Sequence, residues 1–373
     1  MRARELGIVV GTLSPGPLNA ITDVSGVRVG HTTLVAGDGA LEVGRGPVRT
    51  GVTVVVPHHG SVWQEPLFAG CHRLNGNGEL TGLEWIRESG LLTSPIALTN
   101  THSVGVVRDA LVQAEIDGAT QGVFWSLPVV GETWDGVLND INGFHVKAEH
   151  LRNALREATS KAVEEGSVGG GTGMICHGFK GGIGTASRVL PAGQGGFTVG
   201  VLVQANHGRR ERLSVNGVPV GEVITADEVP IPEAPEEAHI HRAGSIIGVV
   251  ATDAPLLPTQ CDRLAQRVGL GIARAGGVGE HSSGDMFVAF STGNRGFPAA
   301  DQGANTPLTA PVTMLVDAFI TPLFDAVVEA TEEAILNALL GAKTMVGRDR
   351  IVAYALEGKR LLEAMKELGR QRA

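Results

Sequence analysis

Cysteine is scarce in this chain, and its few cysteines form no recognisable pattern. The three cysteines, Cys71, Cys176 and Cys261, are far apart and lack the spacing of a metal site. A small, odd number of cysteines is typical of a reducing compartment. We therefore expect three buried thiols in a cytoplasmic protein.

Long apolar runs and clusters of basic residues are absent as well. No apolar run approaches the roughly 18 residues of a spanning helix, and the N-terminal stretch does not resemble a secretory signal. The formal net charge is −9, and no run of Lys or Arg alternates with aromatic residues. We therefore expect no membrane segment and no nucleic-acid surface, but a small-molecule or peptide partner.

Metal-binding and phosphate-binding patterns are missing too. None of the 12 histidines pairs at helix spacing with a third ligand, and His239 and His241 lie in a Pro-rich stretch. The glycine-rich stretch 166–188 lacks the Gly-Lys-Ser/Thr of a phosphate loop, because Gly181 and Gly182 follow Lys180. We expect no metal and no cofactor, and we interpret these glycines as tight turns between closely packed backbones.

What the chain does contain is material for a large core. Hydrophobic residues make up 43% of the sequence, and its 53 glycines are about twice the usual share of roughly 7%. Apolar runs predict strands at 52–56, 96–99, 123–127, 197–204, 246–252 and 286–292. Several runs are apolar at successive positions, which indicates strands covered on both faces.

Helical periodicity occurs near 104–114, 151–158, 316–339 and 357–368. In the third of these, Pro322 predicts either a kink or a later start near Thr321, and Glu329, Glu332 and Glu333 lie opposite the apolar face. These elements together predict a layered protein of helices and sheets.

One junction points to chemistry. Residues 225–241 are rich in proline and acidic residues, which predicts an exposed linker. Directly afterwards Gly244 and Ser245 open the apolar strand. A serine held rigidly after a glycine can attack the preceding carbonyl, because glycine permits strained backbone angles and an open approach. Cleavage there would leave Ser245 with a free amine, whose pKa of about 7.7 to 8.0 suits a base near neutrality.

Several blocks then carry a resemblance to a known family. They include "NAITDVSGVRVGHTTL", "LNGNGELTG", "LTNTHSVG", "LPVVGETWDGVLNDING", "GGGTGMICHGFKGGIGTASR", "VGVLVQANHGRR" and "GEHSSGDMFVAFST". In this order, over nearly the whole chain, they resemble the L-aminopeptidase/D-esterase family, which includes the β-peptidyl aminopeptidases.

The resemblance implies a fold and a processing event. It implies one catalytic domain over 1–373, with an α+β fold in a four-layer αββα sandwich. It also implies self-cleavage into a large chain 1–244 and a small chain 245–373, and assembly of the cleaved pairs into a homo-oligomer of four pairs.

The resemblance also implies roles for individual residues. Ser245 matches the nucleophile, and Asn206 matches an oxyanion donor. Ser283 and Asp285 match the serine and the acid that accompany the nucleophile. Glu132 matches a carboxylate that holds the substrate's free amino group.

One position departs from the family and one histidine is set aside. Trp134 stands where some relatives have tyrosine, and either a substrate-pocket wall or a packed ring would explain it. His281 is interpreted as a loop residue, since the family pattern requires no histidine there.

Three functions remain open from the sequence. The first is a self-processed aminopeptidase that forms an acyl-Ser245 intermediate with peptides, amides or esters. The second is acyl transfer from the same intermediate to an amine acceptor. The third is an uncleaved, non-catalytic binding relative. The joint presence of Gly244, Ser245, Asn206, Ser283 and Asp285 favours catalysis.

Overall fold

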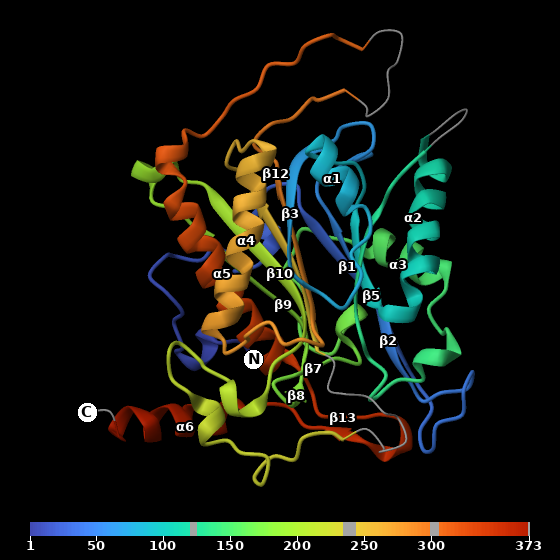
Figure 1. Cartoon of the computed structure of the whole chain (residues 1–373), viewed down its shortest axis with the longest axis vertical. Helices are drawn as coiled ribbons and strands as arrows, with labels where there is room; N and C mark the ends of the chain where they lie inside the picture. Colours follow the sequence, from blue (N-terminus) through green and yellow to red (C-terminus); the bar gives the residue numbers. More distant parts are fainter. Residues whose placement is uncertain (120–124, 234–243, 299–305, 372–373) are drawn as a thin grey trace.

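Two β-sheets lie between two layers of helices (Figure 1). A computed structural model of the chain describes residues 1–119, 125–233, 244–298 and 306–371. The larger sheet has six strands in the order β4-β3-β12-β11-β10-β9, and the smaller has four in the order β1-β2-β5-β6. Their bounds are β1 Arg28–Ala36, β2 Val48–Val56, β3 Leu67–Gly76, β4 Leu91–Leu92, β5 Ile96–Asn100, β6 Val129–Thr133, β9 Gly182–Val189, β10 Thr198–Asn206, β11 Ser245–Thr252 and β12 Gly284–Ser291.

Two helix pairs form the outer layers. Helices α4 and α5 cover the six-stranded sheet, and α2 and α3 cover the four-stranded sheet (Figure 1). The helices are α1 Leu83–Ser89, α2 Val104–Ala119, α3 Ala148–Glu157, α4 Pro258–Arg274, α5 Thr321–Gly341 and α6 Gly358–Gln371. Two short hairpins, β7 Ile175–Cys176 with β8 Phe179–Lys180 and β13 Met345–Val346 with β14 Val352–Ala353, lie outside the main sheets. This arrangement confirms the expected α+β sandwich of four layers.

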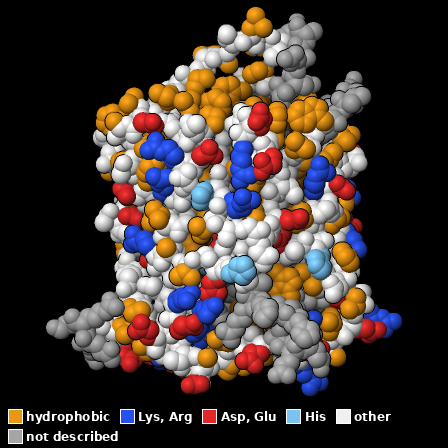
Figure 2. All heavy atoms as spheres, in the orientation of Figure 1, with side chains coloured by type: hydrophobic (Ala, Val, Ile, Leu, Met, Phe, Trp, Pro, Cys, Tyr) orange, Lys and Arg blue, Asp and Glu red, His pale blue; other side chains and the backbone are white. Residues whose placement is uncertain are grey.

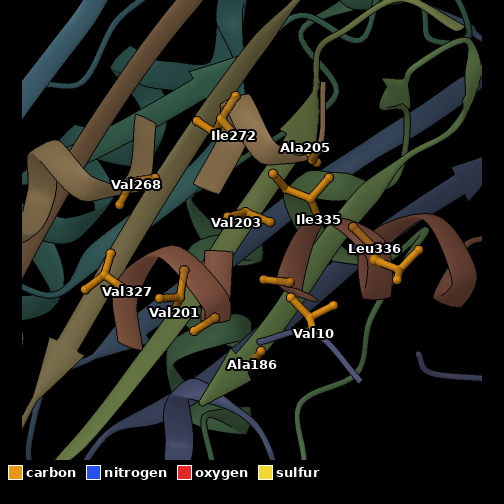
Figure 3. Packing of buried hydrophobic residues seen from close by; sticks show 14 of the residues in the cluster. Val10, Ala186, Val201, Val203, Ala205, Val268, Ile272, Val327, Ile335 and Leu336 are labelled. Carbon is orange, nitrogen blue, oxygen red and sulfur yellow. The ribbon is translucent and has the colours of Figure 1, made fainter. Parts of the chain in front are cut away.

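Three apolar clusters hold the layers together. Leu98, Leu202 and Ile247 belong to the cluster between the sheets. Val201 and Val203 of β10 point the other way and meet α4 and α5 (Figure 3). Because both faces of the six-stranded sheet are covered, every residue of β11 is buried. This double burial is the reason for the continuous apolar runs in the sequence.

Glycines let these layers approach closely. A Cβ at Gly184 would lie 1.9 Å from the carbonyl oxygen of Ala334 on α5. A Cβ at Gly170 would lie 2.1 Å from Gln204 Oε1. The glycines of 166–188 therefore serve close backbone packing, as expected. Part of this stretch nevertheless forms strand β9, which was not predicted because the stretch is rich in glycine.

Most predicted elements are present, with one clear error. The strand expected at 123–127 is wrong: residues 123 and 124 lie outside the described residues, and Trp125–Leu127 is irregular. The strand begins instead at Val129, and β6 pairs in parallel with β5. Trp125 and Leu127 are each 42% exposed, so their apolar character does not reflect strand burial. Strands β1, β3 and β9 and helices α1 and α4 were not predicted.

The long helix α5 starts at Thr321, with Pro322 in its first turn, where proline is tolerated. Its acidic face is buried, not solvated. Arg188, fully buried on β9, places its Nε 3.0 Å from Glu329 and its Nη2 2.7 Å from Glu333. Glu332 instead pairs with Arg274 of α4. These ion pairs fasten α5 to its neighbours.

The segment before Ser245 is described only in part. Residues 225–228 are exposed, and Glu228 pairs with Arg360 of α6; residues 234–243 lie outside the described residues. All three cysteines are buried and free, as expected. In the described part of the chain, no helix combines the length and apolar character needed to cross a membrane.

Candidate active site

Ser245 is the first residue of β11, at the middle of the six-stranded sheet. It pairs with Asn206, the last residue of β10, and with Gly284, the first residue of β12. The Gly284 N–H donates to Ser245 Oγ at 3.2 Å. Ser245 is 5% exposed. Two neighbouring strands thus fix the backbone of Ser245 where the central strands begin, and its hydroxyl accepts a backbone N–H there.

Gly244, the residue before Ser245, lies where there is no room for a side chain. A Cβ at Gly244 would lie 2.9 Å from the Asn206 carbonyl oxygen and 3.0 Å from His207 Cα. Both atoms belong to the backbone at the end of β10, which cannot rotate away. Lack of space therefore explains the glycine before Ser245, in addition to the backbone freedom of glycine.

Asn206 has a fixed side-chain amide. Its Oδ1 accepts the Ile175 N–H at 2.7 Å, and its Nδ2 donates to the Trp134 carbonyl at 3.0 Å. These two partners distinguish the amide oxygen of Asn206 from its amide nitrogen and fix the orientation of the side chain. An amide nitrogen carries two hydrogens, so one remains to donate to an oxygen near Ser245.

Ser283 and Asp285 form a hydrogen-bonded pair beside the start of β11. Ser283 Oγ donates to Asp285 Oδ1 at 2.6 Å, and the Ile246 N–H donates to the same oxygen at 3.2 Å. Burial raises the pKa of Asp285 to about 6, although the Ser283 hydroxyl opposes the rise. The carboxylate thus stays ionised at neutral pH while being a stronger base than an exposed aspartate.

Glu132 lies near the end of β6 and is almost fully buried. Its Oε1 accepts the Glu79 N–H at 2.9 Å, and its Oε2 accepts the Thr101 hydroxyl. Burial raises its pKa above the usual range, while these hydrogen bonds counteract the rise. Gly78 separates this carboxylate from the start of β12: a Cβ there would lie 2.9 Å from Glu132 Oε1 and 3.2 Å from Gly284 Cα. Glu132 is therefore only a few atoms from Ser245's strand partner.

Trp134 follows β6 and contributes its backbone carbonyl to the site through Asn206. Its ring packs over Gly136, where a Cβ would lie 2.4 Å from the indole. Trp134 is half-buried, and both interpretations left open by the sequence, a packed ring and a substrate-pocket wall, stay predictions. His281 lies in an exposed turn, as expected of a loop residue.

Several supporting residues were not singled out from the sequence. Asn75 Oδ1 accepts the Asp285 N–H at 2.9 Å, and Asn77 Nδ2 donates to the Ser282 carbonyl at 2.7 Å. Together with Gly78 and Thr101 they hold the loops around the site. All four belong to the quoted blocks "LNGNGELTG" and "LTNTHSVG", so the signal was present, but a role for each required the contacts.

Comparison with known proteins agrees with this architecture. The profile of peptidase family S58 matches residues 19–353. A β-peptidyl aminopeptidase, BapA of Sphingosinicella microcystinivorans, is 47% identical over 99% of this chain and 93% of its own length. A solved β-aminopeptidase from a Burkholderia species is 55% identical, with a TM-score of 0.90 and 99% coverage of both chains.

A second solved structure bears on the fold. The L-aminopeptidase D-Ala-esterase/amidase of Ochrobactrum anthropi is 43% identical, with a TM-score of 0.88 over 99% of both chains. It is described as a prototype of the serine aminopeptidases and as a variant of the N-terminal-nucleophile hydrolase fold. With the family profile spanning most of the sequence, the chain belongs to peptidase family S58 and is a serine-type aminopeptidase.

Proposed function

We propose that this aminopeptidase cuts its own chain between Gly244 and Ser245 and then uses Ser245 as its nucleophile. The observation that carries the proposal is the position of Ser245. Its backbone pairs with Asn206 and Gly284, its hydroxyl accepts the Gly284 N–H, and it directly follows a glycine that no larger residue could replace without displacement.

The proposed self-cleavage is an attack by Ser245 on the residue before it. Ser245 Oγ attacks the Gly244 carbonyl carbon, and the bond from that carbon to the Ser245 nitrogen breaks. The hydroxyl proton passes to the departing nitrogen, leaving an ester. Water then hydrolyses the ester to give the Gly244 carboxylate and regenerates the hydroxyl. The products are the chains 1–244 and 245–373, and the departure of Gly244 opens space beside the nucleophile.

Turnover uses the same groups on a bound substrate. The new Ser245 amine accepts the hydroxyl proton as Oγ attacks the substrate carbonyl. The remaining N–H of Asn206 stabilises the oxyanion, and Asp285 orients the site through Ser283. The leaving group takes the proton, and water then releases the acyl group from Ser245.

Glu132 accounts for selectivity for a free amino terminus. Its two present hydrogen bonds leave lone pairs that can accept an ammonium group. Since the carboxylate is almost buried, an amide-capped peptide would leave its charge unpaired, at a cost in binding. We propose short peptides, amides or esters with a free amine as substrates, including peptides that begin with a β-amino acid, in keeping with the names of the relatives above.

Acyl transfer is the second candidate activity. The acyl-Ser245 ester can be captured by an amine acceptor in place of water, and the described contacts favour neither outcome. The ratio of transfer product to hydrolysis product, measured at increasing concentrations of an added amino-acid amide, separates the two.

An exposed apolar arm supports assembly into an oligomer of cleaved pairs, which we propose to number four. In this arm, residues 306–319, Leu308, Met314 and Phe319 are 103%, 50% and 68% exposed. Figure 2 shows apolar side chains gathered at the top of the molecule. Contiguous apolar surface of this kind marks interaction sites. The free, buried cysteines are in keeping with a cytoplasmic location.

The test compares Ser245→Ala with Ser291→Ala. Ser291 is a matched control, because it is also a buried strand serine but lies at the opposite end of β12. On a denaturing gel, wild type and Ser291→Ala give two fragments and hydrolyse an aminoacyl p-nitroanilide. Ser245→Ala gives one band and no turnover. A single band from an active wild-type enzyme would contradict the proposal, and a single band from an inactive one would favour a non-catalytic binding relative.

A further inference from the structure

Behind the nucleophile lies a cluster of potential metal ligands. Cys176, His177 and His207 each offer one ligand atom, and these atoms lie within 4.8 Å of one another. All three residues are buried, with exposed fractions of 0%, 0% and 5%. They come from two segments, the end of β7 and the residue after β10, so spacing along the sequence gave no sign of them.

The two imidazoles carry unpartnered nitrogens. His177 Nδ1 lies 2.9 Å from the Arg209 carbonyl oxygen, which can only accept, so Nδ1 carries the hydrogen and Nε2 has a bare lone pair. Within the described part of the chain, neither His177 Nε2 nor His207 Nε2 has a hydrogen-bond partner, although both atoms are inaccessible to solvent. A buried polar atom without a partner calls for an explanation, and a bound ion or water is one of those available.

The thiol of Cys176 favours a metal ion over a water molecule as the missing ligand. Cys176 Sγ is hydrogen-bonded at 3.8 Å to the other nitrogen of His207, Nδ1, and the two imidazole ring centroids are 5.2 Å apart. One sulfur and two imidazole nitrogens are ligands that Zn²⁺ prefers, whereas Ca²⁺ and Mg²⁺ require oxygen.

We propose that Cys176, His177 and His207 bind one divalent transition-metal ion of the Zn²⁺ class. The thiol releases its proton to solvent on binding, and the resulting thiolate and the two imidazoles supply three ligands. A fourth position is left for water, as in other sites with three protein ligands.

The position of the cluster gives the ion a structural task. Cys176 directly follows Ile175, whose N–H holds Asn206 Oδ1, and His207 directly follows Asn206. The ion therefore joins the same two segments that this hydrogen bond joins. A Cβ at Gly244 would touch His207 Cα, so the proposed metal site also lies next to the cleavage site. The ion fixes the amide of Asn206 and takes no part in bond breaking.

Metal content and spectroscopy test the proposal independently of self-cleavage. Purified full-length protein is equilibrated with Zn²⁺ or Co²⁺, freed of excess by gel filtration, and analysed by elemental mass spectrometry and absorption. We expect one ion per chain, and with Co²⁺ a thiolate-to-metal charge-transfer band. Wild-type protein that retains no ion, or that binds Co²⁺ without this band, would overturn the proposal.

Variants locate the ion. Cys176→Ala and His177→Gln should each bind at least 10-fold more weakly, and Zn²⁺ should raise the melting temperature of wild type but not of these variants. Cys261→Ala is the matched control, since Cys261 is equally buried and contacts the Phe68 carbonyl instead; it should bind like wild type. Unchanged binding by Cys176→Ala would assign the ion elsewhere. If that variant does not fold, the charge-transfer band of wild type decides.

Discussion

Replacing Gly244 by alanine should slow self-cleavage without harming the mature enzyme. The added Cβ would lie 2.9 Å from the Asn206 carbonyl oxygen, and ordinary contacts begin near 3.4 Å, so the Gly244 carbonyl must move by about 0.5 Å. A misplacement of about 1 Å can cost on the order of 100-fold in rate, and half that distance corresponds to about 10-fold. Once the chain is cut, residue 244 is no longer attached to Ser245.

The assay follows cell-free synthesis of the chain with time on a denaturing gel. Gly244→Ala should convert to two fragments about 10-fold more slowly than wild type, while turnover per cleaved molecule stays near the wild-type value. Gly105→Ala on α2 is the control, because its Cβ would have no heavy atom within 4 Å. Cleavage of Gly244→Ala at the wild-type rate would refute the spatial explanation of the glycine.

Three further predictions concern binding, pH and stability. Glu132→Gln should raise KM for free-amine substrates about 10- to 100-fold, through loss of a charge-assisted hydrogen bond, and leave self-cleavage unchanged; equal loss in both assays would argue against its role. Below about pH 6, kcat/KM should fall more steeply than protonation of the Ser245 amine alone requires, because Asp285 loses its negative charge as well; Asp285→Asn should lower the rate and remove this extra steepness, and an unchanged slope would contradict the assignment. In an uncleavable Ser245→Ala background, Arg188→Met should lower the free energy of unfolding by about 3–5 kcal/mol, because buried Glu329 loses its arginine and buried Glu333 keeps Arg4 alone; Arg156→Ala, at an exposed pair, should leave the urea midpoint nearly unchanged.

Periodicity predicted the fold where burial follows apolar character. Strand β11 and the helices α2 and α3 were predicted in this way, and of the two outcomes expected from Pro322, a kink or a start near Thr321, α5 shows the second. Periodicity failed where apolar residues are exposed, as at Trp125, and where a strand contains glycines, as β9 does. In β9 the missing side chain at Gly184 makes room for α5, a requirement set by a helix about 150 residues away in the sequence.

The site illustrates a different limit. The Gly244–Ser245 junction was recognisable from local sequence, because a linker, a glycine and a buried strand meet there. That Asn206 and Gly284 flank Ser245 depends on strand order, which apolar patterns do not determine. The cluster of Cys176, His177 and His207 could not be recognised for the same reason, since His207 is 30 residues from His177 along the chain.

Mass spectrometry of the wild-type enzyme, quenched during turnover of an aminoacyl ester, tests most directly whether one hydroxyl performs both cleavage and catalysis. We predict a small chain that begins at residue 245 and carries one acyl group on that residue's side-chain oxygen. An active enzyme that remains a single chain, or an acyl group attached to a different residue, would contradict the account.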